Sequence, residues 1–373
     1  MRGEELEAGW RSEEVKDALD LCLACKGCKH ECPVRVDMAT YKAEFRFHHY
    51  KHRLRPLSHY ALGLIYWEAQ LASRMPALAN LLTQQEPIAT LAKRAVGVSP
   101  KRRAPRFASQ TFRDWFAAQP PHSGHRGRVL LWPDTFTNHF EPEIAIAATE
   151  VLQDAGFEVS LPRRPLCCGR PLYDYGFLDA AERYLRRLVG RLAPYARAGV
   201  PVVGMEPSCL AVLRDELAKM LPHDDDAARV ADHALHFAEL FDRHDADVPR
   251  LEGQALLWGH CHQRATGGTD ADRRVLERMG LEVEPLVGGC CGLAGSWGFE
   301  KGKYEISMEC GEQALLPAVR RAGPETVVVA NGFSCKTQIV QAGTGRRALH
   351  LGEVLQLAQR REAGIAGGGR PEE

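Results

Sequence analysis

Four cysteines near the start of this 373-residue chain are spaced as ligands of an iron–sulfur cluster. Cys22, Cys25, Cys28 and Cys32 stand in the order C-x2-C-x2-C-x3-C, and Pro33 follows directly. This is the spacing of a bacterial-type [4Fe–4S] site. A zinc knuckle or loose thiols are the alternatives, but zinc sites usually carry two well-separated C-x2-C pairs. In two-cluster proteins the last cysteine of such a run binds the other cluster, so the role of Cys32 stays open.

From residue 128 onward the sequence repeats itself, and each copy contains two adjacent cysteines followed by glycine. The matched positions are Trp132 and Trp258, 126 residues apart; Cys167 and Cys290, 123 apart; and Cys209 and Cys335, 126 apart. Each copy closes with Ala-Leu-His-x-x-Glu, at residues 234–239 and 348–353. Matched blocks at nearly one offset indicate an internal duplication.

The second copy supplies four thiols, which we expect at one metal centre: Cys261, Cys290, Cys291 and Cys335. Adjacent cysteines are poorly placed to form a disulfide with each other, but they can present two sulfurs to one metal. The glycine that follows them permits an unusual turn. Buried apolar cysteines would not explain a duplicated Cys-Cys-Gly in loops. An all-cysteine set suits both an iron–sulfur cluster and zinc, so the metal stays open.

The first copy has Thr135 where the second has Cys261, which leaves three thiols: Cys167, Cys168 and Cys209. Either this copy has lost its site, or its cysteines join the second set across the interface between the copies. Asp134, Thr135 and Asn138 could hydrogen-bond cluster sulfurs or a substrate. Alternatively, Asp134 or Thr135 caps the following helix.

Three further side chains near these cysteine sets could bind a metal or transfer a proton. His260 and His262 flank Cys261 and could be ligands or proton carriers, although we expect at least one of them on a surface loop. Cys310 lies in a helical pattern and is interpreted as a free structural thiol, with a role as fifth ligand left open.

The elements expected to position these residues alternate between strand and helix. Short apolar runs at 129–132, 202–204, 256–258 and 327–330 suit buried parallel strands, with helical patterns at 143–155 and 180–192. Each copy is therefore predicted to be α/β, and the copies to be related by pseudo-twofold symmetry. The cysteines follow strands, at the sheet edge where α/β folds bind ligands.

The first 125 residues are predicted to be α-helical. We expect an amphipathic helix over 1–21, a helix capped by Asp37, and one or two helices over 56–95 broken around Pro76. The Pro- and Arg-rich stretch 97–112 is interpreted as a solvated linker, with docking of an acidic partner as the alternative. The expected boundaries are 1–55 (cluster domain), 56–125 (helical linker), 126–250 and 251–362 (the two copies), and 363–373 (flexible tail).

Composition excludes several classes of function. Lys plus Arg equals Asp plus Glu at 48 each, so the chain has no overall positive charge that would attract nucleic acid or an anionic membrane. The N-terminus is charged and lacks the apolar core of a secretory signal, and the stretch 60–82 is too polar to span a bilayer. Twelve cysteines without an export signal indicate metal ligation. We expect a cytoplasmic protein, with attachment to the inner membrane through a partner left open.

The combined motifs resemble a known family. The phrases GCKHECPVRVDMATYKAEF, LCCGRPLYDYGFLD, MEPSCLAVLRDEL and CCGLAGSWGFE are similar to the C-terminal iron–sulfur half of bacterial FAD-linked oxidases of the D-2-hydroxyacid dehydrogenase type. Related modules occur in the B- and D-type components of heterodisulfide reductase and in the iron–sulfur subunits of glycolate oxidase and glycerol-3-phosphate dehydrogenase. The resemblance implies an α-helical ferredoxin-like N-terminal domain, apparently half of a two-cluster one, and two cysteine-rich modules.

The chain departs from this family in two respects. The fused proteins carry a flavin domain and another cysteine group upstream, so this sequence looks like a split-off or truncated C-terminal half. Modules that bind heterodisulfide-type clusters typically end in Cys-x-x-Cys, whereas Cys209 and Cys335 are followed by Leu-Ala-Val and Lys-Thr-Gln. This difference argues against a five-cysteine non-cubane cluster.

The resemblance implies an electron-transfer subunit. Electrons would come from an FAD-linked dehydrogenase partner that oxidises a 2-hydroxyacid (D-lactate, glycolate or D-2-hydroxyglutarate) and pass to a quinone or a soluble carrier. No G-x-G-x-x-G after a strand and no P-loop is found, so FAD is expected on the partner chain. The alternatives are a thiol–disulfide reductase, in which Cys290/Cys291 or Cys167/Cys168 react directly, and a non-catalytic remnant.

Overall fold

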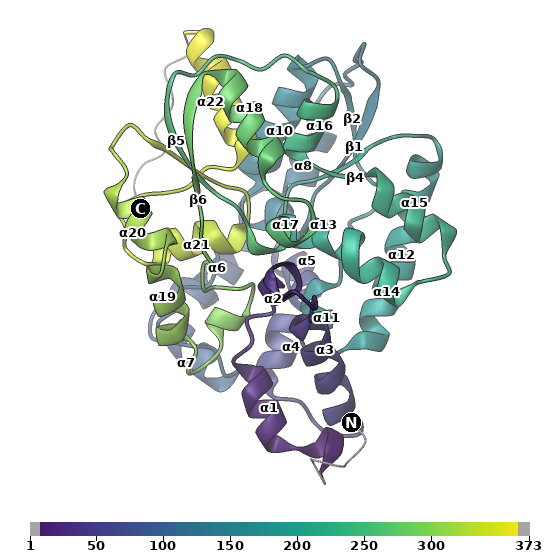
Figure 1. The fold of residues 1–373 in the computed structure, drawn as a ribbon, viewed down its shortest axis with the longest axis vertical. Helices are drawn as coiled ribbons and strands as arrows, with labels where there is room; N and C mark the ends of the chain where they lie inside the picture. Colours follow the sequence, from purple (N-terminus) through teal and green to yellow (C-terminus); the bar gives the residue numbers. More distant parts are fainter. Residues whose placement is uncertain (1–7, 365–373) are drawn as a thin grey trace.

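The computed structural model describes residues 8–364 and contains two parallel sheets above a layer of short helices (Figure 1). The first sheet has the order β2-β1-β3-β4, formed by β1 (Arg128–Trp132), β2 (Glu158–Ser160), β3 (Val202–Gly204) and β4 (Ala234–His236). The second has the order β6-β5-β7, formed by β5 (Gly253–Trp258), β6 (Leu281–Leu286) and β7 (Val327–Ala330). All neighbouring strands are parallel, as expected for short apolar runs covered by helices.

The four predicted strands are present as β1, β3, β5 and β7, whereas β2, β4 and β6 were not predicted. β2 and β4 have only three residues each, and β6 is an edge strand with several exposed side chains. None of the three therefore shows the continuous apolar run on which the prediction depended. The predicted helices over 143–155 and 180–192 correspond to α10 (Pro142–Asp154) and α12 (Leu178–Arg197).

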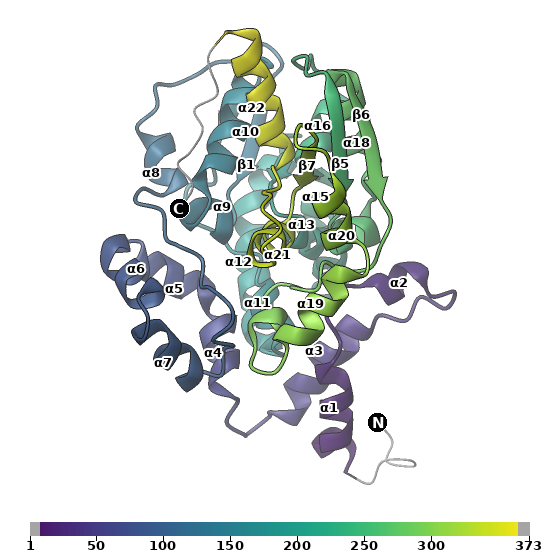
Figure 2. The ribbon, with the colours of Figure 1, turned by 90° about the vertical axis from the view of Figure 1, so that its left-hand side faces the viewer.

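One hydrophobic core joins the two sheets. It contains Leu131 of β1 and Leu257 of β5, together with side chains from α10 and α22 (Leu351–Glu362), which pack on each other. Figure 2 shows these two helices side by side near the top of the molecule. The two copies therefore fold around shared apolar contacts. Their pseudo-twofold relation, and the ferredoxin-like character of the N-terminal part, stay predictions.

The remaining helices of the two copies are short. They are α8 (Phe112–Ala117), α9 (Thr135–His139), α11 (Arg170–Asp174), α13 (Pro207–Ala211), α14 (Leu217–Met220), α15 (Asp225–His233), α16 (Phe237–Arg243), α17 (Cys261–Thr266), α18 (Asp270–Met279), α19 (Tyr304–Glu312), α20 (Leu315–Arg321) and α21 (Phe333–Gln341).

The N-terminal part begins with α1 (Glu13–Asp20), α2 (Gly27–Glu31) and α3 (Met38–His49). The predicted start of the first helix around Leu6 lies outside the described residues, as does most of the predicted tail. The predicted cap at Asp37 is confirmed, because its carboxylate accepts a hydrogen bond from the Thr40 amide at 3.1 Å.

Residues 56–95 form four helices instead of the one or two expected. They are α4 (Leu57–Gly63), α5 (Ile65–Ala72), α6 (Pro76–Gln84) and α7 (Ile88–Ala95). The chain breaks at Leu64, before Pro76 and at Pro87, and proline disfavours helical geometry in the residue before it. Within residues 8–364, no helix combines the length and the apolar character needed to cross a membrane.

The stretch 97–112 is not the fully solvated linker that we expected. The Arg102 side chain is completely buried, donating from Nε to the Gly298 carbonyl at 3.0 Å and from Nη2 to the Ser307 hydroxyl at 2.6 Å. This stretch therefore fixes the helical layer to the second copy.

Candidate metal centre

The carboxyl ends of four strands bring the chemically active residues together. After β1, β3, β5 and β7 the chain enters α9, α13, α17 and α21, each within a few residues of its strand. These helices carry, at or close to their first turn, Thr135, Cys209, Cys261 and Cys335 respectively. The two Cys-Cys-Gly loops follow β2 and β6 and reach the same edge.

The four cysteines of the second copy form a chain of pairwise contacts. Cys261 hydrogen-bonds with Cys290, and Cys291 hydrogen-bonds with both Cys290 and Cys335. The Cys290 thiol donates to Cys261 and lowers its pKa to about 7. The pKa of Cys291 is also held well below its usual range by Cys290 and Cys335. Because the Cys290 thiol has a single proton, Cys335 is the donor to Cys291 while Cys290 donates to Cys261. Two thiolates are thus favoured, and the thiolate is the form that binds metals.

These sulfurs meet in pairs and do not form a finished coordination shell. Among residues 8–364, no three Cys, His, Asp or Glu side chains are arranged around a common point that could hold a metal ion. The donor chemistry nevertheless fits, since four thiols gather at one sheet edge and two of them have lowered pKa values. An all-thiolate set suits an iron–sulfur cluster or zinc.

The first copy has a three-thiol version of this arrangement. The sulfurs of Cys168 and Cys209 lie 3.0 Å apart, and Cys167 hydrogen-bonds with Cys168. The Thr135 hydroxyl interacts with the Cys167 sulfur, as the Cys261 sulfur interacts with Cys290 in the second copy. Thr135 therefore occupies the place of Cys261. The sulfur–sulfur contacts of these cysteines stay within the first copy. They give no support to the alternative in which the cysteines of both copies bind one metal centre.

Glu206 lies between the two sets and was not singled out from the sequence. One of its carboxylate oxygens accepts from the Ser208 amide at 3.1 Å and the other from the Phe333 amide of the second copy at 2.8 Å. Burial raises the pKa of Glu206, and its charge acts on both Cys209 and Cys335. A charged residue directly after an apolar strand and before a proline was the signal that could have revealed it.

The polar residues near the first set have structural partners. Asp134 caps α9 by accepting from the Phe136 amide at 2.7 Å, which confirms the capping alternative, and burial raises its pKa to about 7. Asn138 accepts a hydrogen bond from the Arg113 amide, and its side-chain nitrogen lies 3.0 Å from Nε2 of His139.

Both histidines beside Cys261 are buried, so the expectation that one lies on a surface loop was wrong. Nδ1 of His260 accepts from the His262 amide at 3.2 Å and caps α17. Nε2 of His262 lies 2.8 Å from the carbonyl oxygen of Ala24. Burial holds the pKa of His262 well below its usual range, so the ring is neutral and donates from Nε2.

The N-terminal cysteine run packs directly on the second cysteine set. Burial, followed by the Cys261 thiol and the neighbouring Cys22 and Cys28 thiols, raises the pKa of Cys25 to about 11. α2 contacts α17, the helix that begins with Cys261. Ala24 and Lys26 adopt left-handed backbone angles, with φ of 53° and 60°, which turn the loop sharply around Cys25.

Cys32 lies at the end of α2 and is partly exposed. Its sulfur accepts hydrogen bonds from the backbone amides of Val36 and Val34, which lower its pKa. Cys310 lies half-buried on α19 within reach of the charge on Cys291.

A cavity of about 540 Å³ connects the cysteine edge to the helical layer. Its walls include Cys25, Cys261, Asp134 and Glu206, and cysteines of the first set. The opposite wall is apolar and comes from α4–α7. It includes Ala61, Leu62, Ile65, Ala72, Ala79, Leu82 and Ala89. A mostly apolar cavity with a few convergent polar groups is the usual form of a small-molecule site.

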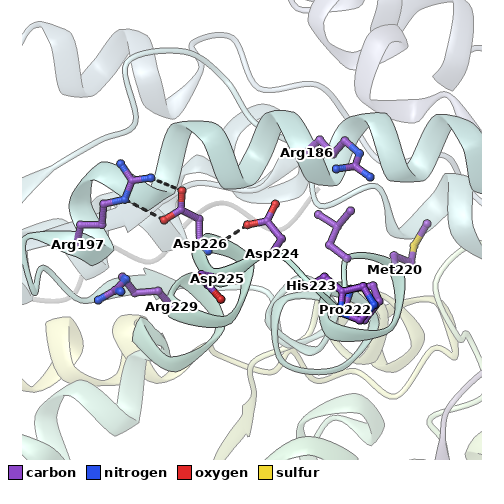
Figure 3. A pocket seen from close by; sticks show the side chains of 10 residues that line it. Arg186, Arg197, Met220, Pro222, His223, Asp224, Asp225, Asp226 and Arg229 are labelled. Atoms are coloured by element: carbon purple, nitrogen blue, oxygen red, sulfur yellow. Dashed lines mark hydrogen bonds and ion pairs between the residues drawn. The ribbon is translucent and has the colours of Figure 1, made fainter.

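A second hollow, shown in Figure 3, shares no lining residue with this cavity. It lies between α12 and the start of α15, where Arg197 forms an ion pair with Asp226 and Asp224 caps the helix. Its lining residues include no cysteine, and it plays no part in the metal centre.

The fold and the site together define a duplicated cysteine-rich α/β unit joined to a helical part with a cluster-type cysteine run. Residues 134–214 and 260–340 each match the family model of the Cysteine-rich domain (CCG), so the chain carries two copies of it.

The relatives agree with the resemblance inferred from the motifs, which is thereby confirmed. The chain is 30% identical to D-2-hydroxyglutarate dehydrogenase of Pseudomonas putida over 94% of its own length and 35% of the relative. It is 28% identical to the C subunit of anaerobic glycerol-3-phosphate dehydrogenase of Escherichia coli K12, over 76% of the chain and 72% of the relative. It is 26% identical to lactate utilization protein A of Geobacillus kaustophilus, over 61% of the chain and 98% of the relative. The chain spans about a third of the D-2-hydroxyglutarate dehydrogenase.

Proposed function

We propose that this chain is the iron–sulfur electron-transfer part of a flavin-dependent dehydrogenase that oxidises a 2-hydroxyacid of the D-lactate, glycolate or D-2-hydroxyglutarate type. Its similarity to dehydrogenases and to a dehydrogenase subunit supports a role in oxidation–reduction chemistry. The flavin would be bound by a partner chain or an upstream half. We place the working protein on the cytoplasmic side, with a quinone or a soluble carrier as acceptor.

The contact of α2 with α17, which brings Cys25 and Cys261 to one wall of the cavity, is the observation that carries this proposal. Cys22, Cys25 and Cys28, with Cys32 or a ligand from the partner, would hold a [4Fe–4S] cluster, and the four thiols of the second copy would hold a second cluster or zinc. A bound cluster accepts and releases single electrons. The Ala24–His262 hydrogen bond keeps the two ligand sets in contact. Asp134 and Glu206 have raised pKa values and can retain protons beside the cavity where an acceptor would bind.

Metal and sulfide analysis of protein purified without oxygen tests this proposal. We expect iron, acid-labile sulfide and a broad visible absorbance, with about four iron atoms lost per chain on Cys25→Ser. Cys310→Ser is the matched control, since it removes a thiol assigned to neither set. Protein that contains no iron under these conditions would exclude the proposal.

A thiol–disulfide reductase is the second candidate, because the sulfurs of Cys168 and Cys209 lie 3.0 Å apart. Hydrogen bonds from Cys167 and Cys209 hold the pKa of Cys168 well below its usual range, as a reactive thiol requires. Turnover of a small disulfide that is lost on Cys168→Ser but retained on Cys25→Ser would favour this candidate over electron transfer.

A further inference from the structure

The outer face of α12 carries a row of arginines. Arg183, Arg187 and Arg191 are exposed and follow one another at four-residue spacing, so they lie on one side of the helix. Arg163 and Arg164 are exposed in the loop that leads to the first Cys-Cys-Gly motif. Within residues 8–364 none of these five guanidinium groups forms an ion pair, so their positive charges are not neutralised by the fold.

The acidic side chains of this region have other partners or positions. Glu182 pairs with Arg186 at 2.7 Å, and Asp226 pairs with Arg197. Asp179 lies in the first turn of α12, where a negative charge stabilises the helix through its dipole. The whole chain has equal numbers of acidic and basic residues, so positive charge is concentrated on this side of the first copy.

Three aromatic rings lie beside Arg187. Its guanidinium carbon is 5.8 Å from the ring centroid of Tyr184 on α12. The Tyr184 ring packs edge-on against two rings of α5, Tyr66 at 5.7 Å and Trp67 at 6.3 Å between centroids, and Trp67 is 50% exposed. The Tyr66 hydroxyl donates to the Pro165 carbonyl at 3.0 Å, so the rings contact the arginine-bearing loop. We call the five unpaired arginines and these three rings the arginine–aromatic surface.

The arginine–aromatic surface adjoins the cavity beside the cysteines. Ile65 and Cys167 line the cavity. Trp67 lies on the same helix as Ile65, and Arg164 precedes Cys167 by three residues. Cys167 is also the thiol of the first set that is only partly buried. A protein bound to the arginine–aromatic surface would therefore lie next to the cavity wall.

We propose that the arginine–aromatic surface docks a soluble electron-carrier protein with an acidic face. This proposal rests on the electron-transfer function proposed above and names its acceptor. Trp, Tyr and Arg supply most of the binding energy in protein–protein interfaces, and opposite charges steer the partners together. On docking, one electron leaves the chain and enters the carrier, and no bond forms or breaks. Arginines also attract nucleic acid and anionic lipid, so both are outcomes of the test.

Surface plasmon resonance with the anaerobically purified full chain tests the docking. The probes are two acidic carriers, a flavodoxin and a plant-type ferredoxin, with the basic carrier cytochrome c as the control. We expect an acidic carrier to bind, with an affinity that falls about tenfold between about 20 and 200 mM salt. Protein that contains iron but binds neither acidic carrier overturns the docking and leaves the proposed function standing. Protein without iron overturns the proposed function instead.

Two kinds of variant separate charge from apolar contact. The variant Arg183→Gln, Arg191→Gln should weaken binding about fivefold, through slower association and a smaller salt dependence. Arg321→Gln, Arg361→Gln removes the same charge at exposed positions of α20 and α22 and should bind as the natural chain does. Figure 1 shows these two helices on the opposite side from α12. Trp67→Ala should weaken binding about tenfold through faster dissociation, with the salt dependence unchanged.

Circular dichroism and the thermal midpoint establish that the variants are folded, which is expected because the altered side chains are exposed. The proposal is overturned if neither acidic carrier binds, or if the arginine variant binds as well as its control. It is also overturned if duplex RNA or phosphatidylglycerol vesicles bind the natural chain more tightly than the carriers do and lose binding in the arginine variant. Nucleic acid or lipid would then cover the arginine–aromatic surface.

Discussion

His262 and Ala24 are 238 residues apart in sequence, and Nε2 of His262 donates to the Ala24 carbonyl oxygen at 2.8 Å. The bond joins the loop that contains Cys22 and Cys25 to the helix that begins with Cys261. Both ends are buried, and within residues 8–364 Nδ1 of the same ring has no hydrogen-bond partner. This neutral imidazole is therefore one of the buried links that position the two cysteine sets relative to each other.

Replacing this imidazole should loosen the cysteine loop. His262→Ala leaves the Ala24 carbonyl without its donor and removes a buried ring, so we expect the free energy of unfolding to fall by about 2 to 3 kcal/mol. Urea unfolding of the metal-free chain measures this change. His223→Ala, at an exposed position, should have an effect within about 0.5 kcal/mol. Equal stability of the two variants would show that the bond does not hold the loop.

Asp215 should make the free energy of unfolding fall as the pH is lowered below about 4. Burial alone would raise its pKa, but Lys26, together with Lys29 and Lys219, lowers the pKa of Asp215 to about 2. A carboxyl with a lowered folded-state pKa stabilises the fold above its unfolded pKa near 4, and the contribution disappears as the pH falls through about 2. Asp215→Asn should therefore cost about 2 kcal/mol at pH 7 and progressively less below about pH 4.

Urea unfolding of the metal-free natural chain and the Asp215→Asn variant at several pH values measures that difference. Asp232→Asn, at an exposed position, should give a difference that stays flat with pH. A constant difference between the natural chain and Asp215→Asn across the same range would contradict the expected coupling to the three lysines.

Arg102 should be irreplaceable by lysine. Its guanidinium donates at once to the Gly298 carbonyl and to the Ser307 hydroxyl, and the compact ammonium of lysine cannot reach both. We expect Arg102→Lys to reduce the free energy of unfolding by about 2 kcal/mol, whereas Arg103→Lys, at the exposed neighbouring position, should change it little. Thermal and urea unfolding distinguish the two variants.

Thr135→Cys should complete the thiol set of the first copy. Thr135 interacts with the Cys167 sulfur at the position where the second copy has Cys261. We expect the variant to bind additional iron or zinc after anaerobic reconstitution, because four thiolates then face one site. Thr149→Cys adds a buried cysteine on α10, away from the sulfurs, and should leave the metal content unchanged. Identical metal content in the two variants would mean that the first copy cannot form a site.

The sequence was sufficient to predict the elements whose signal is local. The apolar runs of β1, β3, β5 and β7, the Asp37 cap and the two cysteine-rich copies each follow from residues close together in the chain. The buried states of His262 and Arg102 could not be predicted in this way, because their partners lie 238 and 196 residues away. A histidine or arginine in a polar stretch has the same local pattern whether it is buried or exposed.

The two anchors of the N-terminal cysteine loop impose an order on the making of this protein. Lys26 pairs with Asp215, 189 residues later, and Ala24 pairs with His262, 238 residues later. A ribosome synthesises the chain from its N-terminus, so Cys22 to Cys32 emerge well before either anchoring residue exists. The loop can reach its packed geometry only after residue 262 has been made, so any cofactor held there is fixed in place late in biogenesis.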